Sequence, residues 1–264
     1  GLRVSRLIVG GNPFSGISHG DASKSDAMRR YYTVARIKQT LADCEFAGIN
    51  TFNGRCDNHI ARMLLEYYAE GGRIQWFAQT APERRDLHAN IRHAAFYGAK
   101  GCYIQGGMVD DMAAAGRFDE VAAALALIRE LGMAAGVAAH NPQNHLMLTE
   151  KGIIPDFHMV CFYNVTGHKG GITQSPRGEE YRPSDREAAV QAVQKLKAPA
   201  IGYKIMAAGR NAPEEAYRFA FKRLRPGDAA CVGFFPKDNP DQIRDSVRLT
   251  LQAIAEAQTS APCP

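Results

Sequence analysis

Eight short apolar runs are spaced along the 264-residue chain, and each ends in a small group of polar residues before a segment with helical spacing. Short apolar runs bounded by turn residues indicate buried strands, whereas apolar positions that recur at helical spacing indicate amphipathic helices. The predicted strands are 6–11, 48–53, 74–79, 101–105, 133–139, 157–163, 199–204 and 229–235. The predicted helices are 25–47, 57–69, 83–97, 119–131, 142–151, 185–197, 213–224 and 240–257.

Local signals mark some of the helix boundaries. Ser184 stands before Asp185, Arg186 and Glu187, which is typical of an N-cap followed by a glutamate at the third helical position. A glycine follows three of the predicted helices, in the place that favours a left-handed backbone: Gly98, Gly132 and Gly152. These signals support helices that start and stop between the predicted strands.

Strands that alternate with helices of this length pair in parallel through right-handed crossovers. Eight such units favour closure into a (β/α)₈ TIM barrel, whose active site is built from the C-terminal ends of its strands. An open, doubly wound sheet should carry a Gly-x-Gly-x-x-Gly loop after its first strand, and Gly10-Gly11-Asn12-Pro13 does not supply one. No linker divides the chain, so we predict one domain that spans residues 1–264.

Two connections on the predicted active-site side are polar. Residues 15–24 follow the first strand, and residues 165–184, with four glycines, follow the sixth. A connection as long as the second one is either a functional lid or a disordered segment. Its place at the rim of the barrel favours a lid.

The polar residues that end the eight apolar runs are the first candidates for a site. In chain order they are Asn12-Pro13-Phe14, Asn53-Gly54-Arg55, Gln79-Thr80, Gln105-Gly106-Gly107, His140-Asn141, Tyr163-Asn164, Tyr203-Lys204 and Phe235-Pro236-Lys237. Several of these ends carry neutral amides at positions where barrel enzymes usually place ionisable groups.

Five segments, taken in order, resemble the aldo-keto reductase superfamily, and the resemblance covers most of the chain. They are 48–53 (GINTFN), 136–141 (GVAAHN), 162–164 (FYN), 201–209 (IGYKIMAAG) and 232–237 (VGFFPK), which are similar to the family's second, fifth, sixth, seventh and eighth strands. The resemblance implies a barrel that binds NAD(P) and reduces a carbonyl. It also implies that Tyr203 is the aromatic residue that stacks on the nicotinamide ring.

The family's proton-handling residues are replaced in this sequence. The resemblance puts the family's Asp on Asn53, its Tyr on or near Asn58, its Lys on Gln79 and its His on Gln105. An amide neither donates a proton at neutral pH nor supplies a charge that tunes a neighbouring tyrosine. The serine that helps to hold the nicotinamide carboxamide falls on Ala138. Hydride transfer by the family's usual route is therefore not expected, and a reductase would need a different acid.

The candidates for catalysis are His140, Lys204, Asp57 and His19. Lys204 ends an apolar strand, where desolvation would lower its pKa and suit it to general-base or Schiff-base chemistry; the alternative is an ion-paired rim lysine. His140 ends the fifth strand and suits proton transfer or substrate binding, against a structural histidine. Asp57 has a competing role as the N-cap of the helix that begins at Asn58.

The candidates for substrate binding are mostly amides: Asn53, Asn58, Gln79, Gln105 and Asn164, together with Arg55. Amides donate and accept hydrogen bonds at once, which suits sugar hydroxyls or a carbonyl. The alternative is that they satisfy one another and ordered water in a decayed site. After the last two strands, Arg210 and Lys237 are candidates to hold a phosphate or carboxylate of a cofactor or ligand, or are solvated surface charges.

The cofactor is left open: NAD(P) binding is possible, and a metal site is less favoured. His19 and His168, in the two polar connections, would have to join His140 and Asp57 to form one, and no HxH or HExxH pattern supports this. His158 lies near the start of the sixth predicted strand and is expected at the opposite, stability-related face of the barrel.

Composition narrows the partners. Hydrophobic residues make up 45% of the chain and charged residues 22%, which is typical of a soluble globular protein, and the net charge of +5 is scattered, which argues against a nucleic-acid partner. No apolar run is long enough to predict a membrane span. The six cysteines form no CxxC pair, so neither a disulfide framework nor a zinc finger is predicted. The sequence leaves the oligomeric state open.

The compartment is also open. The chain begins at Gly1 without an initiator methionine. A cytoplasmic location is slightly favoured, and export remains an alternative if a signal peptide has been removed.

Three functions remain. The first is an enzyme on an aldo-keto-reductase-like barrel with rebuilt chemistry, a lyase, isomerase or hydrolase that acts on a small polyhydroxy or carbonyl compound. The second is an NAD(P)-dependent oxidoreductase with a non-standard proton donor. The third is a ligand-binding barrel without catalysis.

Overall fold

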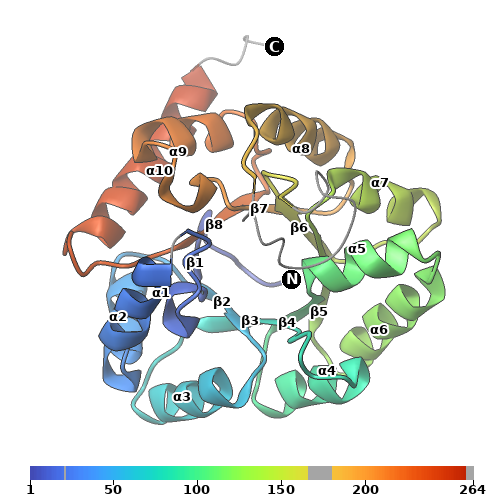
Figure 1. Ribbon diagram of the computed structural model, residues 1–264, viewed down its shortest axis with the longest axis horizontal. Coiled ribbons are helices and arrows are strands. Elements are labelled where there is room, and N and C mark those ends of the chain that lie inside the picture. Colours follow the sequence, from blue (N-terminus) through green and yellow to red (C-terminus); the bar gives the residue numbers. More distant parts are fainter. Residues whose placement is uncertain (21, 166–179, 260–264) are drawn as a thin grey trace.

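The chain forms a closed barrel of eight parallel strands, in which each strand pairs with its neighbours in sequence and the last pairs with the first (Figure 1). The structure is a computed structural model, and it describes residues 1–20, 22–165 and 180–259. The strands are β1 Leu7–Gly10, β2 Thr51–Arg55, β3 Gln75–Gln79, β4 Gly101–Ile104, β5 Ala134–Ala139, β6 Phe157–Cys161, β7 Ala200–Tyr203 and β8 Ala229–Gly233. The predicted (β/α)₈ fold is confirmed.

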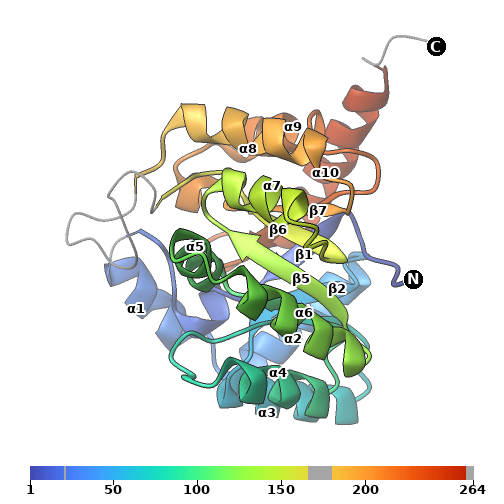
Figure 2. The ribbon, with the colours of Figure 1, turned by 90° about the vertical axis from the view of Figure 1, so that its right-hand side faces the viewer.

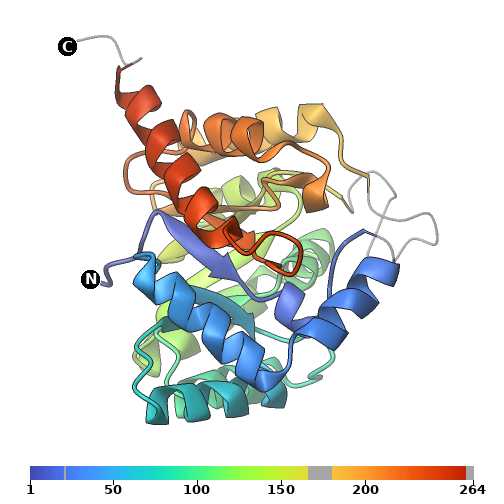
Figure 3. The ribbon, with the colours of Figure 1, turned by 90° about the vertical axis from the view of Figure 1, so that its left-hand side faces the viewer.

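Helices surround the barrel on its outer side (Figure 1). In the described part of the chain they are α1 Ala22–Tyr31, α2 Val34–Phe46, α3 Asn58–Ala69, α4 Leu87–Phe96, α5 Gly106–Ala114, α6 Phe118–Glu130, α7 Pro142–Glu150, α8 Pro183–Lys195, α9 Pro213–Phe221 and α10 Gln242–Thr259. Short 3₁₀ turns η1 Pro13–Ser15 and η3 Ala207–Gly209 follow β1 and β7. Figure 3 shows α2 and α10 on either side of β1.

Three helix predictions were wrong in detail. The segment 25–47 is two helices, because Thr33 leaves the helical conformation and its hydroxyl accepts a hydrogen bond from the Arg36 N–H at 3.3 Å as the cap of α2. Ser184 does not cap α8, which begins one residue earlier at Pro183, a residue suited to the first helical position. Helix α4 begins at Leu87 rather than 83, because Asp86 caps it.

Helix α5 was not predicted at all. It begins with Gly106 and Gly107, and glycine costs about 1 kcal/mol relative to alanine in a helix, so the sequence pattern gave no helical signal there. The side chain of Gln105 caps it by accepting a hydrogen bond from the Met108 N–H at 3.1 Å. This helix brings an unpredicted carboxylate to the site described below.

The predicted helix-ending glycines adopt the left-handed backbone that the position requires. Gly98, Gly132 and Gly152 have φ angles of 80°, 76° and 76°, where a side chain is disfavoured. Each therefore ends its helix and returns the chain toward the next strand, as the sequence indicated.

Two packed regions hold the fold together. Side chains between the strands and the helices form the larger one, which includes the single tryptophan, Trp76, with no exposed surface. The smaller one fills the barrel interior, and its buried members are Ile8, Phe77, Tyr103, Ala138, Phe157, Met159, Ile201, Ala229 and Cys231. Because successive side chains of a strand point to opposite faces, every second residue of a strand faces this interior.

The interior residues close the lower part of the barrel and leave its C-terminal end open to a site. Figure 2 shows the strands pointing toward the side of the molecule where α1 lies, whereas the N-terminus lies on the other side. The connection 165–184, predicted as a lid, has residues 166–179 outside the described part of the chain. None of the helices in the described ranges is long and apolar enough to cross a membrane.

Candidate active site

A cavity of about 840 Å³ opens at the C-terminal ends of the strands. Nine of the residues singled out in the sequence line it: His19, Asn53, Arg55, Gln79, Gln105, His140, Tyr203, Lys204 and Lys237. Strand alternation explains most of this set. Gln79 stands two residues after the interior Phe77, and His140 stands two residues after the interior Ala138, so both amide and imidazole face the barrel axis above the packed core.

Four other predicted residues are not among those that line the cavity. Asp57 caps α3, since its Oδ1 accepts a hydrogen bond from the Ile60 N–H at 2.9 Å. Asn58 accepts a hydrogen bond from the Arg84 guanidinium at 2.7 Å at an exposed position. The remaining two are Asn164 and Arg210. His168 lies outside the described residues.

The floor of the cavity is a network of neutral groups around Tyr103, a residue that the sequence analysis did not single out. Its hydroxyl donates to Asn53 Oδ1 at 2.7 Å, and the Gln79 side chain also hydrogen-bonds it. Asn53 Nδ2 in turn lies 3.4 Å from Cys231 Sγ. Burial raises the pKa of the Tyr103 hydroxyl well above its usual value, so this group stays protonated at neutral pH. The floor therefore offers hydrogen bonds without charge.

One wall of the cavity carries an imidazole–carboxylate pair. His140 Nδ1 lies 2.9 Å from Asp110 Oδ2, and the same carboxylate oxygen accepts a hydrogen bond from the His140 backbone N–H at 3.0 Å. Asp110 Oδ1 accepts another from Asn144 Nδ2 at 2.7 Å. Both side chains are mostly buried, 13% and 17% exposed. Since an ionised carboxylate only accepts hydrogen bonds, Nδ1 carries the proton and Nε2 is the basic nitrogen.

Asp110 was not among the predicted site residues because the helix that carries it, α5, was not predicted. The adjacent pair Asp110-Asp111 lies in a segment that starts with two glycines and reads as part of a loop. The only available signal was an acidic residue four positions after Gly106, the first residue of this helix. The tertiary fold places this helix against β5, where its carboxylate meets His140.

Gly106 and Tyr203 pack around the imidazole. A Cβ atom at Gly106 would lie 3.2 Å from both His140 Cε1 and the Tyr203 hydroxyl, so this glycine leaves room for both groups. The rings of His140 and Tyr203 meet edge to face, with centroids 6.2 Å apart. The Tyr203 hydroxyl donates to the Ala139 carbonyl at 3.3 Å, and burial raises its pKa well above the usual value. This tyrosine is therefore a neutral hydrogen-bonding group.

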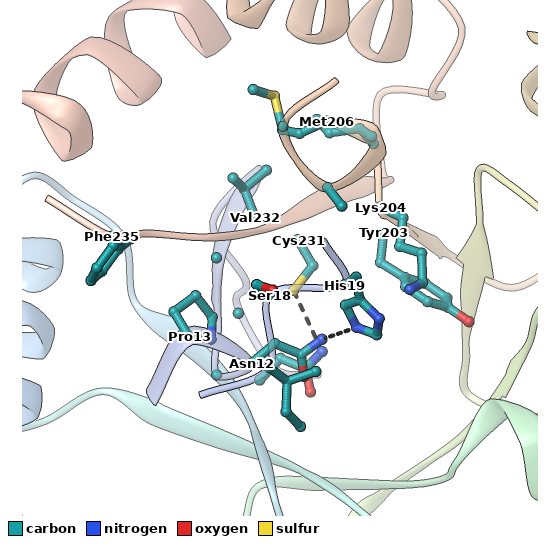
Figure 4. Close-up of a pocket in the computed structure, with 18 of the residues that line it drawn as sticks. Asn12, Pro13, Ser18, His19, Tyr203, Lys204, Met206, Cys231, Val232 and Phe235 are labelled. Atoms are coloured by element: carbon teal, nitrogen blue, oxygen red, sulfur yellow. Dashed lines mark hydrogen bonds between the residues drawn. The ribbon is translucent and has the colours of Figure 1, made fainter. Parts of the chain in front are cut away.

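The connection after β1 contributes a second histidine to the cavity (Figure 4). Asn12 Nδ2 donates to His19 Nε2 at 2.9 Å, which assigns the proton of the neutral ring to Nδ1. His19 has a left-handed backbone with φ of 54°, which is uncommon for a residue with a side chain. Asn12 and this backbone conformation together fix how the imidazole faces the cavity.

Lys204 lies at the end of β7, at the cavity edge shown in Figure 4. It has a left-handed backbone with φ of 59°, and its Nζ lies 5.9 Å from the centre of the Tyr181 ring. The left-handed region costs roughly 1–2 kcal/mol for a residue with a side chain, so packing around β7 and η3 must hold Lys204 in this conformation.

Arg55, at the end of β2, is held by acidic neighbours. It forms an ion pair with Glu83, and its Nε lies 3.4 Å from Asp57 Oδ2. Burial lowers the pKa of the guanidinium, but the hydrogen bond and the charge of Glu83 outweigh that effect, and the net direction is upward. Arg55 therefore lines the cavity as a protonated guanidinium whose charge is balanced by the carboxylates of Glu83 and Asp57.

The described residues contain no cluster of three or more His, Cys, Asp or Glu side chains arranged to hold a metal ion. His158 lies away from the cavity, buried against His145, with their Nδ1 atoms 3.0 Å apart. The chemistry that the cavity can supply rests on an acid–base pair, neutral hydrogen-bonding groups and cations.

Comparison with protein families and with curated proteins finds no match. Solved structures do match. Two, provisionally described as aldo-keto reductases from Pseudomonas aeruginosa, share 18% identity, and one of them superposes with a TM-score of 0.61 over 96% of this chain and 93% of the other. The second gives a TM-score of 0.58 over 96% and 92%.

Barrels with other activities match as well. An archaeal ribulose 1,5-bisphosphate carboxylase/oxygenase matches with a TM-score of 0.56 and 13% identity, over 98% of this chain and 61% of the other. The same fold thus carries different chemistries in these neighbours. At these identities the comparisons show that the chain has the TIM-barrel fold that aldo-keto reductases also have.

Proposed function

We propose that this protein is an enzyme that moves a proton on a small polyhydroxy or carbonyl compound, with His140 as the acid–base group. The observation that carries the proposal is the contact of His140 Nδ1 with Asp110 Oδ2 at 2.9 Å inside the cavity. A carboxylate behind an imidazole fixes its tautomer and stabilises the imidazolium that forms when Nε2 takes a proton.

The rest of the cavity suits such a substrate. Neutral donors and acceptors on the floor, Tyr103, Asn53 and Gln79, match hydroxyl and carbonyl oxygens. When His140 removes a proton from the carbon next to a carbonyl, negative charge develops on the carbonyl oxygen, and hydrogen-bond donors at the floor stabilise it. The reaction class is therefore isomerisation or carbon–carbon lyase chemistry through an enolate. Lys204 and His19 are proposed as substrate-binding groups at the edge of the same cavity.

Deuterium exchange tests the proposal without knowledge of the full reaction. The protein is incubated in D₂O with a panel of hydroxy ketones, aldoses and hydroxy acids, and loss of the proton next to the carbonyl is followed by ¹H NMR. General acid–base catalysis contributes about 10²–10⁴-fold, so His140→Ala should lower the exchange rate by that order. Asp110→Asn should lower it at least about tenfold, because the amide no longer favours the reactive tautomer.

A matched control distinguishes chemistry from general damage. His59→Ala changes an exposed histidine on α3, outside the cavity, and should leave the exchange rate within about twofold. If the protein binds a compound of the panel but exchanges no proton, the barrel binds ligands without this catalysis and the proposal is wrong. It is equally wrong if His140→Ala exchanges as fast as the unmodified protein.

A nicotinamide-dependent oxidoreductase is the second candidate, because Tyr203 lines the cavity at the end of β7 as an aromatic ring that a nicotinamide would stack on. The fit is incomplete. Ala138 offers no hydroxyl to the carboxamide, and His140 would have to replace the missing proton donor. Titration with NADPH and NADH, followed by fluorescence and by thermal shift, tests this candidate. Absence of binding at millimolar cofactor would eliminate it.

A further inference from the structure

Cations gather at the β7 edge of the cavity. Lys24 on α1 and Lys204 at the end of β7 both line it, although they are far apart in the sequence. Lys24 Nζ lies 3.4 Å from the position that a Cβ atom at Gly209 would take, so α1 reaches across to the η3 turn. Arg210 follows that turn, and its guanidinium lies 4.4 Å from the centre of the Tyr181 ring.

Tyr181 links two of these cations. The Lys204 ammonium lies 5.9 Å from the centre of the same ring that Arg210 contacts. Each cation is attracted to the face of the ring, and an anion that binds beside them would be attracted by both. The Arg210 guanidinium is also held in place by donating to the Ala207 carbonyl at 3.0 Å.

The backbone at this edge is strained. Ala207 and Ala208 have φ angles of 46° and 56°, left-handed values that cost roughly 1–2 kcal/mol each for residues with side chains. Together with Lys204, three non-glycine residues within one short segment adopt this conformation. Strain of this kind concentrates at ligand-binding segments, where the surrounding fold holds it in place.

Among the described residues, basic side chains outnumber acidic ones in the lining of the cavity. Five basic side chains line the cavity, Lys24, Arg55, Lys204, Lys237 and Arg248, against three acidic ones, Glu214, Asp238 and Asp245. Arg55 pairs with Glu83 and Asp57, and Arg248 lies 3.5 Å from Asp245. The floor, in contrast, is neutral. The cavity therefore has neutral hydrogen-bonding groups at its floor and basic side chains at its β7 edge.

We propose that the ligand of this cavity is a hydroxy or oxo compound that carries an anionic group, a phosphate or a carboxylate, held by Lys24 and Lys204. Arg210 adds to the positive potential from behind Tyr181. The neutral end of the ligand lies on the floor near Tyr103 and faces His140. This inference deepens the proposed function and rests on it for the identity of the site, but ligand affinity tests it without turnover.

Isothermal titration calorimetry of the intact protein provides the test, with three probes that share a three-carbon hydroxylated skeleton and differ in the anionic group that they carry. These are glycerol 3-phosphate, glycerate and neutral glycerol. The two anions should bind at least about tenfold more tightly than glycerol, and their affinity should fall with added salt because exposed charges are screened. The better of the two anions identifies the group as phosphate or carboxylate.

Variants assign the effect to the cluster. Lys24→Met and Lys204→Met should each weaken binding of the better anion about tenfold. Lys195→Met, at an exposed position on α8, removes the same charge and should have less than about a twofold effect. Lys24 is itself exposed on α1, so its replacement does not disturb the core.

Three results would overturn the inference: equal affinity for glycerol and the anions, an equal loss on Lys195→Met, or tight binding of ADP-ribose in a protein that ignores glycerol 3-phosphate. The last would assign the cations to a dinucleotide. His140→Ala separates this inference from the proposed function, because it should slow deuterium exchange by about 10²–10⁴-fold and still bind the anion. Exchange without anion binding would remove only the anionic group from the proposal.

Discussion

Acid should destabilise this protein through a buried histidine pair, His145 on α7 and His158 on β6. Their Nδ1 atoms lie 3.0 Å apart, and the two side chains are 0% and 1% exposed. Only one of the two facing nitrogens can carry a proton while the other accepts it, so the contact is lost if both rings are protonated. Burial lowers the pKa of His158 from its usual range to about 4, with Arg225 acting in the same direction.

The size of the effect follows from the pKa difference. An unfolded histidine has a pKa of about 6.5, so the unfolded chain binds the proton first as pH falls. Stability is therefore complete above that value and is lost between it and the folded pKa. At pH 5 the loss from His158 is about 2 kcal/mol, at 1.36 kcal/mol per pH unit below 6.5. Burial also lowers the pKa of His145 well below its usual value, which adds to the loss.

Urea unfolding at pH 7.5 and pH 5, followed by the fluorescence of Trp76, measures the loss, since this single tryptophan is fully buried. His158→Asn keeps a hydrogen-bonding amide opposite His145 but cannot titrate. The variant should lose about 2 kcal/mol less than the unmodified protein between the two pH values. The exposed His59→Asn should show the unmodified dependence. Equal losses in the unmodified protein and His158→Asn, within about 0.5 kcal/mol, would refute the reasoning.

Three further predictions concern the site and its support. Asp57→Ala removes the α3 cap and should cost about 1 kcal/mol of unfolding free energy, seen as a melting temperature lower by a few degrees. Tyr103→Phe leaves Asn53 Oδ1 without its donor and should cost about 1–3 kcal/mol in urea unfolding. Gly106→Ala would place a methyl group 3.2 Å from His140 Cε1, so it should slow deuterium exchange while changing the melting temperature little. An unchanged exchange rate would contradict the packing described.

Much of the fold was accessible from the sequence because it depends on local periodicity. All eight predicted strands are present, each within a few residues of its predicted bounds. Two errors in the predicted helices can be traced to particular residues. Thr33 divides the predicted helix 25–47 into two, and the two glycines at the start of α5 gave no helical signal. The first is a local capping contact that the apolar pattern does not show, and in the second helix formation occurs despite unfavourable propensity, which is only a weak guide.

The candidate site was only partly accessible. Strand alternation predicts which side chains face the barrel, so His140 and Gln79 were found, and both line the cavity. Tyr103 also faces the barrel interior by strand alternation, but it stands within an apolar strand. A tyrosine at such a position is ordinarily interpreted as part of the buried core. Asp57 was proposed for catalysis beside its possible role as a cap, and its hydrogen bond to Ile60 is that of a cap.

The sequence by itself determined the eight-fold alternation, and with it the barrel and the set of residues at its C-terminal end. Only the tertiary structure decided which of these meet. Asp110 stands 30 positions before His140, and Asn53 stands 50 before Tyr103, yet each pair is in hydrogen-bond contact. Such contacts depend on barrel closure, strand register and the placement of α5, which arise from long-range packing that no local pattern encodes.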